Sequence, residues 1–334
     1  MTVSVHLVTW NNRTFIPTLR RSLEAQTRKP DRIIVVDNAS TDGTLELLDT
    51  WPGIDVLRHT RNLGFARAHN QAIRLSKADA VVVLNPDVLL EPTCLEVLTQ
   101  ALDTTPQVAS VCPKLLRFSL TADDLREPVY SDTIDAAGML LRRSRQVLNR
   151  GEGSSDRGQF DQARDVFGAP GVLALYRRTV LDDVAVNGEY FDEDFFAYKE
   201  DVDLAWRCQL AGWRCRYVPA ARAYHYRTLS HHRDRLAALV ETRGRRSRML
   251  RVLSYRNHLL MLLKNETVGT FLPHGFSITL YELQKLGYAL LREWSTLTAL
   301  PSLFRLLPRM LQKRRLIQRR RRRSTRELRR IIES

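Results

Sequence analysis

Apolar segments alternate with amphipathic ones over the first hundred residues, and this alternation limits the fold more than any other feature of the chain. Four segments have the composition of buried strands: residues 3–8, 33–36, 54–58 and 80–84. Four others have the spacing of amphipathic helices: residues 15–26, 44–51, 66–76 and 92–103. Strands that alternate with helices predict an α/β fold, with a doubly wound, mostly parallel sheet covered by helices on both faces.

The second half of the chain has a less regular pattern of apolar and polar residues. Residues 119–165 are polar, contain glycine and indicate hairpins and loops, whereas 200–211 has a helical pattern and 214–218 resembles a strand. From about residue 229 the pattern becomes helical and rich in arginine. Three apolar stretches in this part resemble amphipathic segments: residues 259–263, 271–280 and 286–300. We therefore expect an α/β domain over 1–230 and an amphipathic, Arg-rich helical region over 231–334.

The charge of the chain is concentrated at its C-terminal end. The net charge is +15, and residues 301–334 contain 13 basic and 2 acidic residues. The first residues lack a basic segment followed by an apolar core, so no signal peptide is expected. No run approaches the roughly 18 apolar residues of a spanning helix. The four cysteines form no CxxC pair, and a cytosolic protein with reduced thiols is expected.

Polar side chains stand where predicted strands end. Asp37 ends the second strand, and Asn85 and Asp87 follow the strand 80–84. Ligands bind at the carboxyl ends of strands in such sheets. Turn formation explains Asp42 well, but for Asp37 a structural role and a ligand-binding role are equally supported. Asn85 and Asp87 form an oxygen-rich pair, which suits Mg²⁺ or Mn²⁺.

A second group of charged residues lies near the helix 200–211. Glu200, Asp201 and Asp203 crowd its N-terminus, where acids are favoured by the helix dipole and where a general base is an alternative. His225 follows soon after, although a lone histidine is more often a packed residue than a metal ligand. The turn at Asn62 and Gly64 is weak evidence for phosphate binding, because the chain has no P-loop or GxGxxG motif.

Taken in order, several motifs resemble those of the inverting glycosyltransferases of family 2, which have the GT-A fold. They are VTWNN, VVDNASTDGT, NLGFARAHN, LNPDV, YKEDVDLAWR and YHYRT, and together they cover about residues 1–230. The NPDV motif and the later segment SYRNHLLMLLKNE are most similar to the rhamnosyltransferase-like branch.

The resemblance implies roles for individual residues. It assigns Asp201 as the catalytic base with Glu200 beside it, and a metal ion, Mg²⁺ or Mn²⁺, to Asp87 and His225. It implies a nucleotide-sugar site formed by Thr9, Asp37, Asn38, Asn62, Gly64, Arg67 and Asn85. It places Gly168, Ala169, Pro170, Gly171 and Trp206 on the acceptor side.

The resemblance also implies an activity. We expect the protein to transfer a sugar to a hydroxyl group of a lipid-linked or polysaccharide acceptor. The first candidate for this sugar is L-rhamnose, with dTDP-rhamnose as the donor. A UDP-sugar donor stays open, because Asp37 would pair with thymine or uracil alike. Rival readings are a nucleotidyltransferase and a basic adaptor that binds membranes or nucleic acid and carries an inactive transferase domain.

The basic C-terminal region allows three interpretations. It is a solvated tail, a nucleic-acid-binding tail or a segment attracted to anionic lipid. The tail lacks the interleaved aromatic residues that stack on bases, which disfavours specific nucleic-acid binding. The apolar stretches before it favour a peripheral protein on the cytoplasmic face of the cell membrane.

Overall fold

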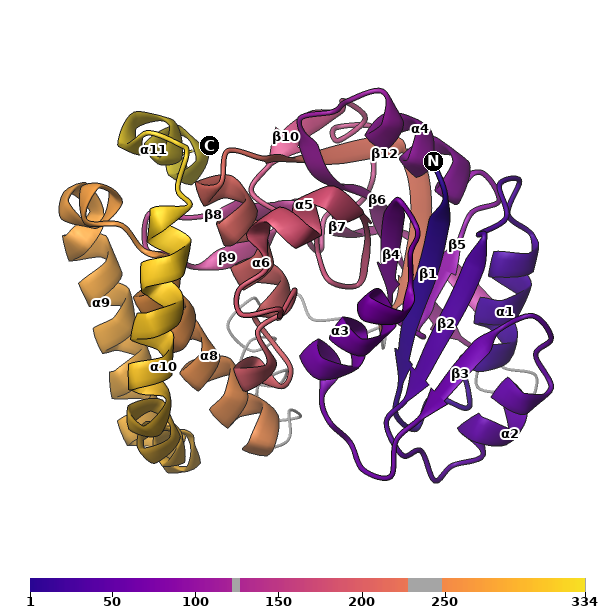
Figure 1. The fold of residues 1–334 in the computed structure, drawn as a ribbon, viewed down its shortest axis with the longest axis horizontal. Helices are drawn as coiled ribbons and strands as arrows, with labels where there is room; N and C mark the ends of the chain where they lie inside the picture. Colours follow the sequence, from indigo (N-terminus) through magenta and orange to yellow (C-terminus); the bar gives the residue numbers. More distant parts are fainter. Residues whose placement is uncertain (122–126, 228–247, 334) are drawn as a thin grey trace.

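A mixed β-sheet with helices on both faces forms the centre of the computed structural model, which describes residues 1–121, 127–227 and 248–333 (Figure 1). Its strands are β1 (Val3–Thr9), β2 (Arg32–Asp37), β3 (Asp55–Arg58), β4 (Ala80–Leu84), β5 (Val88–Leu90), β6 (Val108–Leu120), β7 (Pro128–Ala136), β10 (Arg164–Val166), β11 (Leu173–Arg177) and β12 (Arg214–Tyr226). A separate hairpin pairs β8 (Met139–Leu141) with β9 (Val147–Asn149).

The strand order is β10-β12-β6-β11-β4-β1-β2-β3, with β5 paired to β12 and β7 paired to β6. β4, β1, β2 and β3 run parallel, and β11 is antiparallel to both β4 and β6. This confirms the predicted α/β class with a mostly parallel N-terminal half. The antiparallel strand β11 places the segment before it beside the carboxyl end of β4.

The helices surround this sheet and continue into a group at one side of the molecule (Figure 1). They are α1 (Ile16–Glu24), α2 (Thr44–Asp49), α3 (Phe65–Leu75), α4 (Cys94–Asp103), α5 (Arg178–Val184), α6 (Glu200–Leu210), α8 (Arg248–Asn265), α9 (Val268–Arg292), α10 (Ala299–Arg319) and α11 (Thr325–Glu333). Two short 3₁₀ helices are η1 (Glu193–Phe195) and η2 (Trp294–Thr298). The predicted domain boundary at residue 230 lies outside the described residues.

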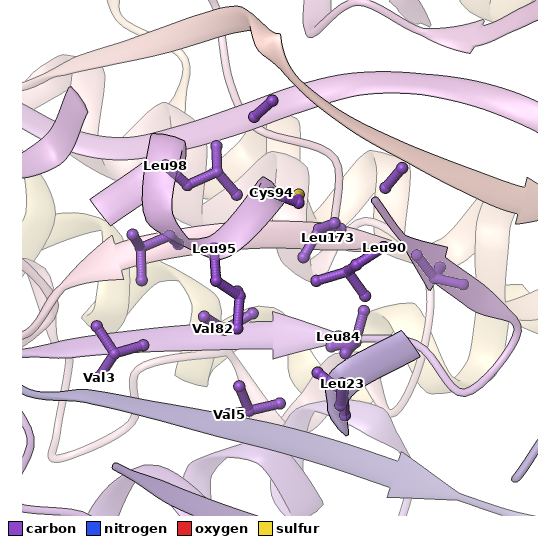
Figure 2. Packing of buried hydrophobic residues seen from close by; sticks show 14 of the residues in the cluster. Val3, Val5, Leu23, Val82, Leu84, Leu90, Cys94, Leu95, Leu98 and Leu173 are labelled. Carbon is purple, nitrogen blue, oxygen red and sulfur yellow. The ribbon is translucent and has the colours of Figure 1, made fainter. Parts of the chain in front are cut away.

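Burial on both faces explains why the strand 80–84 is a continuous apolar run. Val82 and Leu84 face a core that includes residues of α1 and α4, as Figure 2 shows, and Val81 and Val83 face a second core with residues of α3 and α6. All four side chains are completely buried. Each such burial stabilises the fold by about 1.5–3 kcal/mol relative to an exposed side chain.

Two expectations about local structure can be compared with the observed strands. The hairpins expected within residues 119–165 are present, because β7 pairs antiparallel with β6 and β8 pairs antiparallel with β9. The strand predicted over 214–218 continues to Tyr226 after an irregular register between Val218 and Arg222. His225 therefore lies within a strand, and its neighbours in the sheet hold its backbone in place.

The C-terminal helices share a continuous core with the segment that contains α6. Leu260, Met310 and Ile332 pack in one cluster with Phe195 and Trp206 of the segment that contains α6. No helix in the described ranges combines the length and the hydropathy that a membrane crossing would need.

Two buried lysines of the C-terminal helices serve this docking. Lys313 is buried and contacts Asp192 at 2.6 Å and Glu189 at 2.9 Å, and Lys264 contacts Asp192 at 2.5 Å and Asp203 at 2.7 Å. These contacts join α8 and α10 to the acidic segment that leads into α6.

The arginine run 319–323 is also partly docked. Arg322 pairs with Asp183 at 2.7 Å, and Arg323 donates to the carbonyl oxygen of Trp213 at 2.9 Å. Arg320 donates to the carbonyl oxygen of Ala185 at 2.6 Å. The run is therefore largely exposed but also anchored, because three of its five arginines bind residues of the α/β part of the chain.

Candidate active site

Asp87 and His225 meet at one edge of the sheet, where β5 pairs with the end of β12. The Oδ2 atom of Asp87 lies 3.4 Å from Nε2 of His225, and the amide of Tyr226 donates to the carbonyl oxygen of Asp87 at 2.9 Å. On the other side of the ring, Nδ1 of His225 lies 2.8 Å from Oδ2 of Asp135. The imidazole is thus held between two carboxylates from different segments.

This pair has the chemistry of a partial metal site. Oδ1 of Asp87 is buried without a hydrogen-bond partner among the described residues, so one carboxylate oxygen is left for a ligand. A histidine whose second nitrogen is held by a carboxylate is a common arrangement around metals. Within the described ranges no three acidic, histidine or cysteine side chains gather as a complete ligand set. The two residues fit a divalent ion whose remaining ligands are diphosphate oxygens and water.

The electrostatics of His225 follow from this arrangement. Burial by itself lowers the pKa of the ring, but the hydrogen bonds to Asp135 and Asp87 outweigh it and raise the pKa above its usual value. For Asp135, burial opposes ionisation, yet its bonds to His225 and Arg227 hold the pKa of the carboxyl well below its ordinary range. Asp135 is thus a permanent negative charge that orients the ring.

Asp201 occupies the first turn of α6, and its carboxylate accepts two backbone hydrogen bonds. Oδ2 accepts from the amide of Gly171 at 3.0 Å, and Oδ1 accepts from the amide of Val202 at 2.7 Å. A β-carbon on Gly171 would lie 3.1 Å from the β-carbon of Asp201, so glycine permits this close approach. The side chain is half-buried and is therefore within reach of a ligand.

Glu200 differs sharply from its neighbour. Its side chain is buried, its Oε2 atom has no hydrogen-bond partner in the described part of the chain, and burial together with the charge of Asp201 raises its pKa to about 8. At neutral pH Glu200 is therefore protonated and uncharged. Of these two adjacent acids, only Asp201 has an accessible carboxylate.

One backbone segment contacts both Asp201 and the strand end that leads to Asp87. The amide of Gly171 binds Asp201, and the carbonyl oxygen of the next residue, Val172, accepts from the amide of Asn85 at 2.9 Å. Asn85 lies two residues before Asp87 at the end of β4. The acids at the ends of two distant segments are thus linked through two neighbouring peptide groups.

The loop before α6 is strained and is held from the C-terminal region. Phe196, Tyr198 and Lys199 have φ values of 64°, 71° and 73°, a left-handed conformation that costs a residue other than glycine on the order of 1–3 kcal/mol. Nδ2 of Asn257 in α8 lies 2.8 Å, 2.9 Å and 2.8 Å from the carbonyl oxygens of Phe195, Ala197 and Tyr198. A residue far along the chain therefore helps to fix the position of Glu200 and Asp201.

The turn before α3 contacts this loop. Asn62 caps the turn by accepting from the amide of Gly64 at 2.8 Å. Gly64 has φ +85°, and a β-carbon there would lie 2.5 Å from the carbonyl oxygen of Phe196, so only glycine fits. Arg67 is half-exposed and lies 3.7 Å from Glu193. These three predicted nucleotide-sugar residues thus lie near the loop that leads to Asp201.

Asp37 is more enclosed than its predicted role suggests. It is completely buried, and its carboxylate accepts from the hydroxyl of Thr9 at 2.9 Å and from the amide and hydroxyl of Ser40 at 2.9 Å and 2.5 Å. Asn38 is also buried and bonds His59 at 2.8 Å. In this conformation Thr9, Asp37 and Asn38 organise the loop after β2, and a contact with a nucleotide base would require Thr9 or Ser40 to move.

Of the five acceptor-side residues, only Gly171 contacts an expected catalytic group. Trp206 is 4% exposed and packs edge-on against Phe167 in the core shared with the C-terminal helices. Ala169 and Pro170 are buried, and a β-carbon on Gly168 would lie 2.4 Å from that of Ala205. In this structure Trp206 is a packing residue of α6, and its placement beside an acceptor stays a prediction.

Sequence reasoning missed Asp135 and Asn257. Asp135 falls in the segment predicted as irregular, and it is separated from His225 by 90 residues. Asn257 lies within the SYRNHLLMLLKNE segment. The similarity of this segment to the rhamnosyltransferase-like branch was the one feature of the sequence that could have indicated a role for Asn257.

Comparison with known proteins identifies the family of this chain. Residues 4–185 match glycosyl transferase family 2. An N-acetylglucosaminyl-diphospho-decaprenol L-rhamnosyltransferase of Mycobacterium tuberculosis (strain ATCC 25618 / H37Rv) is 30% identical over 232 residues, which cover 64% of this chain and 72% of the relative. Rhamnosyltransferase WbbL of Escherichia coli (strain K12) is 28% identical over 246 residues, which cover 70% of this chain and 85% of the relative.

The fold has a counterpart among solved structures. A crystal structure of GalNAc-T7 with UDP, GalNAc and Mn²⁺ superposes with a TM-score of 0.59 at 14% identity, over 83% of this chain and 51% of that one. This chain therefore spans about half of that structure, and the likeness supports the GT-A fold alone. On the family match and the two rhamnosyltransferase relatives, the chain belongs to glycosyl transferase family 2 and is a glycosyltransferase of its rhamnosyltransferase-like branch.

Proposed function

We propose that the protein transfers L-rhamnose from dTDP-rhamnose to a hydroxyl group of a lipid-linked saccharide, with inversion at the anomeric carbon. The observation that carries this proposal is the link between Asp201 and Asp87 through Gly171, Val172 and Asn85. Both curated relatives are named as rhamnosyltransferases, and the name of one specifies a diphospho-decaprenol acceptor. These names support the choice of sugar and acceptor class.

The proposed reaction is one displacement. The acceptor oxygen forms a bond to the anomeric carbon and loses its proton to the carboxylate of Asp201, while the bond between that carbon and the diphosphate breaks and dTDP leaves with the electron pair. Proton transfer to a positioned base contributes about 10²–10⁴-fold to the rate. Mg²⁺ or Mn²⁺ held by Asp87 and His225 would supply positive charge beside the leaving diphosphate. Asp135 keeps the His225 ring oriented.

A donor comparison tests this assignment. The purified protein is incubated with Mn²⁺, a short-chain prenyl-diphospho-N-acetylglucosamine and either dTDP-rhamnose, UDP-galactose or UDP-N-acetylglucosamine. We expect acceptor-dependent release of nucleoside diphosphate to be at least tenfold faster with dTDP-rhamnose. A faster rate with a UDP-sugar would replace the donor assignment, and no release with any donor would refute the proposed activity.

We also propose that the protein binds the cytoplasmic face of the cell membrane through α9. Large apolar side chains are exposed along the outer face of this helix, including Leu272, Phe276, Leu283 and Leu291, of which Phe276 is 82% exposed. Their spacing places them on one side of the helix. Exposed apolar stripes of this kind mark surfaces that bind partners or membranes. Because part of the arginine run is docked, we assign the larger share of binding to α9.

Liposome flotation measures this directly. We expect the wild-type protein to float with vesicles that contain anionic lipid and a Phe276→Glu, Leu291→Glu variant to lose at least tenfold in the floated fraction, with unchanged thermal unfolding. The matched control is Arg319→Glu, Arg321→Glu, which alters exposed charges of the arginine run and should reduce flotation less. Equal flotation of the α9 variant and the wild type would contradict this proposal.

A further inference from the structure

A polar pocket of about 330 Å³ lies between the β8–β9 hairpin, α8, α9 and η2, on the side of α6 where the C-terminal helices pack. Its volume falls within the range of roughly 300–1,000 Å³ typical of ligand sites. Figure 1 shows α8 next to α6 and α9 farther out in the same group of helices, with β8 and β9 close to α6. None of the predicted donor residues lines this pocket, so it is separate from the nucleotide-sugar side.

The pocket reaches the catalytic loop. Lys199 is one of its lining residues and is the N-cap of α6, two residues before Asp201. Two residues of chain span at most about 7 Å between their α-carbons. Lys199 therefore joins the pocket to the short segment that carries the base.

The chemistry of the lining residues is that of a site for a sugar and an anion. Tyr255, Tyr281 and Tyr288 contribute rings with an apolar face and a polar hydroxyl, which match the apolar faces and hydroxyl edges of a pyranose. Arg251, Lys285 and Lys199 contribute positive charge. Such cations form charge-assisted hydrogen bonds with phosphate oxygens.

Acidic groups near the pocket are fewer than the cations. Glu293 is the acidic lining residue and accepts from the hydroxyl of Thr296 at 3.2 Å. Glu282 pairs with Lys285 at 3.0 Å and with Nε2 of His258 at 2.7 Å, which ties α9 to α8. Within the described ranges, the three lining cations outnumber these two acids, a balance that favours an anionic ligand.

Helix α9 joins this pocket to the proposed membrane surface. Tyr281, Lys285 and Tyr288 face the pocket, whereas Phe276 and Leu291 belong to the exposed apolar face of the same helix. A helix that lies on a membrane with its apolar face would hold the pocket next to the headgroup region. This is where the diphosphate and first sugar of a prenyl-linked saccharide are found.

We propose that this pocket binds the diphosphate-linked sugar of a prenyl-diphospho-saccharide and presents its hydroxyl group to Asp201. The proposal rests on the proposed function for the identity of the reaction, but binding at the pocket is measured without turnover. Lys285 and Arg251 contact the diphosphate, and the tyrosine rings contact the sugar.

The test is calorimetric titration of farnesyl-diphospho-N-acetylglucosamine into the full chain, alongside titration of dTDP-rhamnose with Mn²⁺. For Lys285→Met and for Tyr281→Leu, we expect at least a tenfold rise in the Kd of the prenyl-linked sugar and a change of less than threefold in the Kd of dTDP-rhamnose. The matched control is Arg292→Met, which removes an exposed cation of α9 that does not line the pocket and should change neither Kd.

The outcomes separate this proposal from the proposed function. Unchanged affinity of Lys285→Met and Tyr281→Leu for the prenyl-linked sugar would overturn the pocket assignment, even if the wild type transfers rhamnose. Loss of that affinity in both variants, in a protein that transfers no rhamnose, would uphold the pocket and refute the donor assignment. If Arg292→Met lost affinity equally, general charge rather than this pocket would explain binding, and the assignment would fail.

Discussion

Replacing Asp201 with asparagine is expected to lower kcat by about 10²–10⁴-fold, the contribution of a positioned general base. Asparagine has the same shape, and its amide oxygen is still able to accept from Gly171 or Val202, the two amides that bind the carboxylate. The fold and the Kd of the nucleotide sugar should therefore stay within threefold of the wild type. Single-turnover kinetics and donor titration measure both quantities.

Glu200 offers a matched control beside the base. Burial and the charge of Asp201 raise its pKa to about 8, so it is neutral at pH 7, and glutamine reproduces that state in size and charge. Glu200→Gln should keep kcat within about threefold at pH 7. The assignment of the base would be reversed if Glu200→Gln lost activity and Asp201→Asn kept it.

The pKa of Glu200 also predicts a direction for stability. The folded state holds a proton on this group up to about pH 8, whereas the unfolded state releases it near pH 4.5. Between these values the folded protein binds more protons, so the contribution of this group to stability falls as pH rises, by up to about 1.4 kcal/mol for each unit. Glu200→Gln removes this loss, and its unfolding temperature should exceed that of the wild type most clearly near pH 8.

Replacing Asp87 with alanine is expected to lower turnover by about 10³-fold at saturating Mn²⁺. The ion contributes several kcal/mol to stabilising the leaving diphosphate, and each 1.4 kcal/mol corresponds to about tenfold in rate. The variant removes both carboxylate oxygens, including the buried Oδ1 atom that has no hydrogen-bond partner among the described residues. The measurement is the Mn²⁺ dependence of kcat, with circular dichroism to confirm that the fold is kept.

Glu91 supplies the control for this variant. It lies on the same segment, just after β5, and its carboxylate accepts from the hydroxyl of Tyr224 at 3.0 Å rather than facing His225. Glu91→Gln should leave the Mn²⁺ dependence unchanged. An Asp87→Ala enzyme with wild-type turnover and the same Mn²⁺ dependence would show that the metal is held elsewhere.

The folded structure changes the interpretation of the basic C-terminal region. From the sequence its charge suggests an external anionic partner, whereas the structure shows Lys264 and Lys313 buried against Asp192 and neighbouring acids. Removing one partner of such a buried pair destabilises a protein strongly, because the other charge is left uncompensated. These contacts also place Asn257 against the strained loop before Asp201. The region is thus part of the support of the active site.

The sequence by itself determined the α/β class, the four N-terminal strands and the acids at their ends. These features are local, because a strand buried on both faces is a continuous apolar run and a residue that ends such a strand lies at the edge of the sheet. Asp37 and Asp87 are identifiable on that basis, whereas Asp201 lies in the first turn of helix α6. The family resemblance added their expected roles.

Only the tertiary structure decided which side chains work together. The Asp135–His225–Asp87 row joins residues up to 138 positions apart, and its carboxylate anchor comes from a strand whose polar pattern resembles a loop. Asn257 and Lys313 look like surface residues of helices until α8 and α10 pack on α6. Contacts between distant segments produce no periodic pattern in a sequence. The chemistry of each partner depends on its burial, and it is buried only because the other segment packs against it.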